Sequence, residues 1–75
     1  MSPFALTDLE RACLVTTEEV ERLAGRVHVT ENGLAVVEAT SPALAGAAAR
    51  MKLGGEVEFI GFNTLGLAVY ARSRA

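Results

Sequence analysis

One stretch decides how the chain folds: residues 41–59, which read SPALAGAAARMKLGGEVEF. Its first half favours a helix, because Ser41-Pro42 is a good N-cap and first-turn pair and alanine has the highest helix propensity. Its second half alternates apolar and charged residues, which is typical of strands. The two interpretations overlap over residues 41–50, and both remain open there.

The register of the charges favours strand from about Ala48. A hairpin with the loop Leu53-Gly54-Gly55 would align opposite charges across two strands and keep the apolar residues on the other face. The resulting pairs are Lys52 with Glu56, Arg50 with Glu58, Met51 with Val57 and Ala49 with Phe59.

The first third of the chain predicts a helical lead-in over residues 1–25. Thr7-Asp8-Leu9-Glu10 and Thr16-Thr17-Glu18-Glu19 both have the spacing of a capping box, in which a hydroxyl and a carboxylate satisfy free backbone amides. Gly25 then supplies a stop signal.

Residues 26–75 predict an antiparallel sheet of four or five strands. Asn32-Gly33 is a strong hairpin-turn signal after Val27 and Val29, and a last strand follows Gly66. The residues from Leu34 to Ala39 are apolar on both faces, which indicates a strand that is covered on both sides. The fold class expected is a single domain, residues 1–75, mainly β with a short helical N-terminus.

Length and composition together predict a homo-oligomer. A chain of 75 residues has little interior, yet 51% of its residues are hydrophobic and its mean hydropathy is +0.32. The lone Cys13 cannot form a disulfide within the chain to support so small a core. We therefore expect subunits to bury apolar surface between them, and a ring is one such assembly.

Catalysis, metal binding and membrane insertion are not expected. His28 is flanked by valines and lies far from Cys13 in sequence, so we expect a structural role for it. We expect Cys13 to be a small core residue. No apolar stretch approaches the ~20 residues needed to span a bilayer, and the first residues lack the features of a signal peptide. A cytoplasmic protein without a cofactor is the expectation.

The net charge of −2 argues against general binding of polyanions, but the second half of the chain is the more basic half. Its basic residues include Arg50, Lys52 and Arg72. Pairing with nearby acids would explain them. Alternatively, one or two basic residues per subunit, repeated around an oligomer, would form a binding track.

A scatter of residues over positions 27–74 resembles the trp RNA-binding attenuation proteins. The matching residues are Glu31-Asn32-Gly33-Leu34-Ala35-Val36, Thr40, Lys52-Leu53, Gly55-Glu56-Val57, Phe62, Ala68-Val69 and Arg72. The resemblance implies a ring of identical subunits that binds tryptophan between subunits, wraps single-stranded RNA around its rim and regulates transcription by attenuation.

The resemblance also implies site residues. Lys52 and Arg72 match RNA-contacting basic positions, and Arg50 lies two residues from Lys52 on the expected strand. Thr40 matches a threonine of the tryptophan pocket, and Asn63 and Thr64 complete the candidate ligand-binding set. Asn63 stands where the family has threonine, so the tryptophan pocket is matched only in part.

Two other function classes remain open. One is an oligomeric protein-interaction or scaffold module that binds no nucleic acid. The other is a DNA-binding dimer with swapped hairpins of the AbrB kind, which the segment Leu53-Gly54-Gly55-Glu56-Val57-Glu58-Phe59 resembles.

Overall fold

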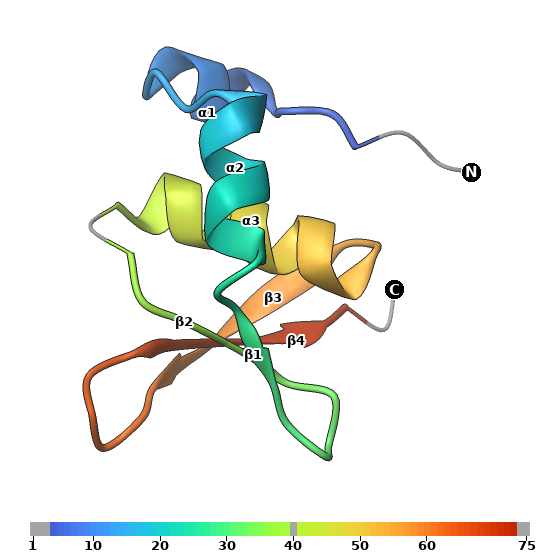
Figure 1. Cartoon of the computed structure of the whole chain (residues 1–75), viewed down its shortest axis with the longest axis vertical. Coiled ribbons are helices and arrows are strands. Elements are labelled where there is room, and N and C mark those ends of the chain that lie inside the picture. The colour runs from blue at the N-terminus through green and yellow to red at the C-terminus, as the bar shows by residue number, and fades with distance from the viewer. Residues whose placement is uncertain (1–3, 40, 74–75) are drawn as a thin grey trace.

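The computed structural model describes residues 4–39 and 41–73. These residues form a four-stranded sheet with a layer of helices on one side of it (Figure 1). About 36% of the described residues are helical and 23% lie in strands, so the expectation of a mainly β chain is wrong. The helices are α1 (Asp8–Ala12), α2 (Thr17–Ala24) and α3 (Pro42–Leu53), and the strands are β1 (His28–Val29), β2 (Ala35–Val37), β3 (Val57–Phe62) and β4 (Ala68–Arg72).

Both predicted capping boxes are confirmed and start the first two helices. The Thr7 backbone N–H donates to Glu10 Oε1 at 2.9 Å, and the Glu10 N–H donates to Thr7 Oγ1 at 3.2 Å. Thr16 and Glu19 make the same reciprocal pair at the start of α2. Each box satisfies two backbone groups that the first turn of a helix leaves unpaired.

The end of α1 carries backbone strain at an exposed leucine. Leu14 has φ of 62°, in the left-handed region where glycine normally stands, and its side chain is 84% exposed. The Val15 N–H donates to the Glu10 carbonyl and the Leu14 N–H to the Arg11 carbonyl, which is the hydrogen-bond pattern of a Schellman motif. These hydrogen bonds hold Leu14 in a conformation that its side chain disfavours.

Leu14→Gly is therefore expected to stabilise the monomer fold by up to about 1 kcal/mol, because glycine adopts this conformation without the Cβ clash. Leu14→Ala is the matched control, since alanine removes most of the exposed side chain but keeps the clash. Urea unfolding of the three proteins measures the effect. A less stable glycine variant would show that the leucine side chain contributes contacts that outweigh its strain.

Residues 42–53 form helix α3 and not a strand from Ala48, so the predicted Leu53-Gly54-Gly55 hairpin is wrong. Ser41 is the N-cap, Pro42 occupies the first turn, and Gly54 ends the helix with φ of 78°. The helix packs against α2 on one side and against β2, β3 and β4 on another. Four of its alanines are buried by this double cover: Ala45, Ala47, Ala48 and Ala49, which are 0–3% exposed.

The sheet is antiparallel and has the order β1-β2-β4-β3, which places β1 and β3 at its edges. The predicted turn at Asn32-Gly33 is confirmed: Gly33 has φ of 81°, and the Thr30 N–H donates to the Leu34 carbonyl at 2.8 Å. β3 and β4 form a second hairpin whose register shifts between Phe59 and Gly61. Ile60 is the extra residue in β3, so β3 contains a bulge.

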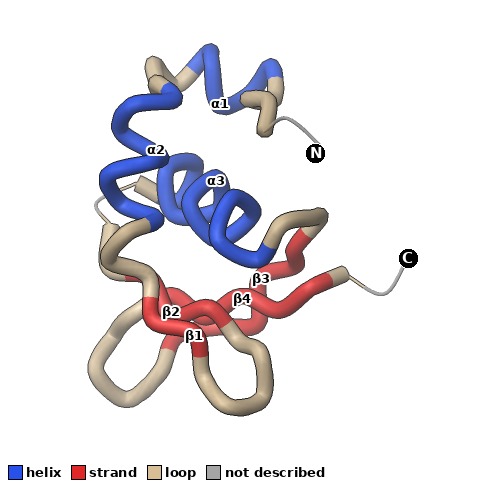
Figure 2. Tube along the Cα trace, turned by 45° about the vertical axis from the view of Figure 1, so that its right-hand side comes forward, coloured by secondary structure: helices blue, strands red, loops and turns tan. Residues whose placement is uncertain are grey.

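The helices cover only one face of the sheet, as Figure 2 shows. On that face Ala35, Val37 and Tyr70 join α3 in the main core. Val36 and Val69 pair with each other in the register and point to the other face, where no described helix lies. The strand predicted within residues 34–39 is thus present as β2, but the described chain covers only one of its two apolar faces, so a cover on the second face stays a prediction.

Candidate functional site

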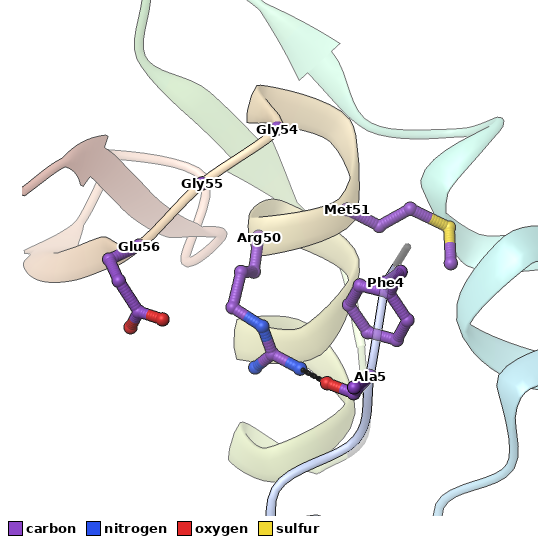
Figure 3. Close-up of a pocket in the computed structure, with 7 residues that line it drawn as sticks. All are labelled: Phe4, Ala5, Arg50, Met51, Gly54, Gly55 and Glu56. Carbon is purple, nitrogen blue, oxygen red and sulfur yellow. Dashed lines mark hydrogen bonds between the residues drawn. The ribbon is translucent and has the colours of Figure 1, made fainter. Parts of the chain in front are cut away.

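Arg50, expected to contact RNA, is half-buried and forms an ion pair within the protein. Its guanidinium donates to both carboxylate oxygens of Glu10, at 2.7 and 2.9 Å, and to the Ala5 carbonyl at 2.6 Å. Figure 3 shows Arg50 extending from α3 to Ala5, and the guanidinium carbon lies 4.6 Å from the centre of the Phe4 ring. Arg50 therefore ties residues 4–10 to α3.

The ion pair is largely shielded from water, and it shifts the pKa values of both Glu10 and Arg50. The Arg50 side chain is 14% exposed and that of Glu10 is 8% exposed. Hydrogen bonds from Arg50 hold the pKa of Glu10 below its ordinary value, against the opposing effect of burial. Hydrogen bonding to Glu10 likewise raises the pKa of Arg50. Neither group is poised to exchange a proton near neutral pH.

A shallow cleft of about 280 Å³ lies beside this ion pair (Figure 3). Among the described residues that line the cleft, Arg50 is the only basic one, and its guanidinium already donates to Glu10 and Ala5. Because Glu56 stands on the opposite wall, the cleft offers little attraction to an anion. The residues that line it are Phe4, Ala5, Arg50, Met51, Gly54, Gly55 and Glu56.

The other two RNA candidates, Lys52 and Arg72, are exposed but do not share a strand face with Arg50. Lys52 lies in the last turn of α3, and Arg72 ends β4. Two residues along a helix are about 200° apart around its axis, so Arg50 and Lys52 point in nearly opposite directions. RNA binding stays a prediction, but the strand expected to align these two residues does not exist.

Asn63 and Thr64, the candidate ligand residues that the structure describes, lie in the connection between β3 and β4. Thr40 lies outside the described residues. Asn63 shapes the turn between β3 and β4, because its Oδ1 accepts hydrogen bonds from the Leu65 and Leu67 amides, both at 2.9 Å. Thr64 is exposed in the same turn. Asn63 therefore has a structural role that explains its presence.

A larger hollow, of about 540 Å³, lies between the first turns of α3 and the strands β3 and β4. We call it the β3 groove. Apolar and aromatic side chains form most of it, including Tyr70, whose pKa is raised by burial. The groove is lined by Ala39, Ser41, Pro42, Ala45, Phe59, Phe62, Ala68 and Tyr70.

The groove opens beside an edge strand that exposes large apolar side chains. Phe59 is 53% exposed, Ile60 56%, Phe62 72% and Leu65 80%. We call these four residues the β3 surface. The Phe59 ring makes edge contacts with Phe62 and Tyr70, with ring centres 5.3 and 5.5 Å apart. The exposed aromatic rings are thus held in place by neighbours and do not hang freely in solvent.

Sequence reasoning missed this surface, although its residues are adjacent in the chain. Phe59-Ile60-Gly61-Phe62 is an apolar run, but a run of this length is equally typical of a buried strand. Only the place of β3 at the sheet edge shows that the run is exposed. Cys13, expected in the core, is also exposed.

Compared with known proteins, the chain matches no family model, no curated protein and no solved structure. Among residues 4–39 and 41–73, no helix is long and apolar enough to cross a membrane. The same residues contain no group of three or more histidine, cysteine or acidic side chains placed to hold a metal ion.

Proposed function

We propose that this chain is a non-catalytic interaction module that associates with further copies of itself through the β3 surface. The proposal rests on four exposed apolar side chains on one edge strand and the turn that follows it: Phe59, Ile60, Phe62 and Leu65. Small soluble domains seldom expose so many large apolar side chains together unless the surface binds a partner.

The edge position of β3 strengthens the proposal. An edge strand presents backbone amides and carbonyls without a neighbouring strand, and natural proteins usually protect such edges with charge, proline or a covering segment. In β3 the charged residue Glu58 is followed by Phe59, Ile60, Gly61 and Phe62. Between Phe59 and Phe62 the edge therefore carries neither a charge nor a proline, and its bulge, which hinders pairing with a regular strand, is the protection that remains.

The titratable groups with clearly shifted pKa values in the described chain have structural roles. The pKa values that clearly depart from their ordinary values belong to Glu10, Arg50 and Tyr70. The internal ion pair explains the first two shifts, and burial explains the third. These perturbed groups have structural causes, so they supply no acid, base or nucleophile for the proposed function.

Light scattering over a dilution series tests the proposal. The wild-type mass should be a multiple of 7.9 kDa at micromolar concentration. Phe62→Ser should weaken association about tenfold or more, because it removes an aromatic anchor from the centre of the surface. Since Phe62 is 72% exposed, the monomer should remain folded.

Leu9→Ser is the matched control. Leu9 is 69% exposed but lies on α1, away from β3, so its replacement should leave the mass unchanged. A wild-type chain that is monomeric at every concentration would refute self-association. Equal effects of the two variants would show that association does not depend on the β3 surface.

A further inference from the structure

We infer that two copies of this chain join their β3 strands antiparallel about a twofold axis that passes between Ile60 and Gly61. This inference rests on the proposed function and adds the partner, the orientation and the register. It follows from the backbone of the edge strand, from the bulge within it, and from the order of the side chains.

The backbone groups that β3 offers to a partner follow from its pairing with β4. The Ser73 N–H donates to the Glu56 carbonyl, and the Asn63 N–H donates to the Leu67 carbonyl, so both ends of this pairing are fixed. Backbone groups alternate between inward and outward along an antiparallel strand. Val57 and Phe59 therefore point their amides away from β4 in the first half of the strand, and Phe62 does so after the bulge.

The bulge makes this edge complementary to itself. Phe59 and Phe62 are separated by two residues, whereas outward residues of a regular strand are separated by one. A regular strand from another protein could match one of these positions but not both. A second copy carries the same irregular spacing, so Phe59 meets Phe62 of the second copy twice, and each such pair exchanges two backbone hydrogen bonds.

The side chains agree with this register. Phe59 and Phe62 are both paired with residues on the helix-covered face, at Tyr70 and Ala68, so the four phenylalanines of the dimer would meet on that face beside the two β3 grooves. On the other face Ile60 lies opposite Gly61 of the second copy. A Cβ on Gly61 would have no atom within 4 Å in the single chain, so the position has room for the neighbouring isoleucine.

Charge selects this register over the main competitor. A pairing of Val57 with Phe59 of the second copy also uses two outward-facing residues, but it sets Glu58 directly opposite its own copy. Like charges in that position destabilise a strand pair. In the register we infer, Glu58 instead lies opposite Asn63 of the second copy, at the end of the paired segment.

Disulfide trapping tests the register. Across the twofold axis the two Ile60 residues would be diagonal neighbours about 6 Å apart between Cα atoms, within the range that a disulfide spans. Ile60→Cys, made in a Cys13→Ser background to remove the exposed native thiol, should therefore give a covalent dimer under mild oxidation. Leu65→Cys in the same background is the control, because Leu65 is more exposed but, in the turn beyond the end of β3, would lie more than about 20 Å from its copy.

Amide hydrogen exchange gives a second measurement that needs no cysteine. The Phe59 and Phe62 amides face away from β4, so only a partner strand would protect them. Their exchange should slow about tenfold or more in the associated protein and recover on dilution.

Each outcome is decisive. Trapping at position 60 without trapping at 65, together with protection of both amides, supports the register. Equal trapping at both positions indicates random collision and overturns it. An associated wild-type protein that does not trap at 60 overturns the register while the proposed function stands. A wild-type monomer overturns both.

Discussion

Arg50→Met is expected to destabilise the protein by about 3–5 kcal/mol, because it leaves the shielded Glu10 carboxylate without its partner. A loss of that size is a large share of the stability of a small domain. Thermal or urea unfolding followed by circular dichroism measures it. Arg11→Met is the control, since the Arg11–Asp8 pair is exposed and should contribute under about 1 kcal/mol.

The double variant Glu10→Leu with Arg50→Met should recover much of the loss, because apolar side chains of similar size can replace a buried ion pair. The stability of the wild-type protein should also depend on pH, because the ion pair requires an ionised Glu10. The pKa of Glu10 is lowered in the folded state, so the ion pair stabilises fully above the ordinary carboxyl value of 4.5 and is lost as the pH falls through the lowered folded value. An Arg50→Met protein as stable as the wild type would contradict this account.

Ala48→Leu is expected to destabilise the protein by about 1–3 kcal/mol through overpacking. Ala48 is fully buried in the main core with Ala35 and Val37, so three added heavy atoms must displace the helix or the sheet. The change should appear as a lower urea midpoint with helical content retained.

Lys52→Leu is the matched control for this substitution, because it places the same side chain on the same helix at an exposed position. It should change the stability by roughly 0.5 kcal/mol or less. If Ala48→Leu were equally mild, α3 would lie farther from the sheet than the structure places it.

The predicted Leu53-Gly54-Gly55 hairpin was wrong because the packing of α3 hides the period of its helix in the sequence. Alanine favours helix, but an apolar residue at four of the five positions from 45 to 49 shows no helical period, because Ala45, Ala47, Ala48 and Ala49 leave no polar face. Because α2 and the sheet cover α3 from two sides, its buried residues do not form one narrow stripe. The basic residues Arg50 and Lys52 alternate with apolar residues, which is the pattern of a half-buried strand.

Local signals were enough for several features of this protein. The capping boxes at Thr7 and Thr16, the Ser41-Pro42 helix start and the Asn32-Gly33 turn all depend on contacts within four residues along the chain. Such contacts form whatever the rest of the chain does, so the sequence alone determined them. The sequence pattern also predicted an antiparallel sheet of four or five strands, and the structure has four, but the pairing predicted for residues 56–59 was wrong.

Tertiary structure decided what the exposed and charged residues do. Arg50 pairs with Glu10, which is forty residues away in sequence, and no local pattern connects the two. Phe59, Ile60 and Phe62 are exposed only because β3 lies at the edge of the sheet and not in its centre. Strand order and long-range ion pairs depend on which segments meet when the whole chain packs, and that information is not contained in any single stretch of the sequence.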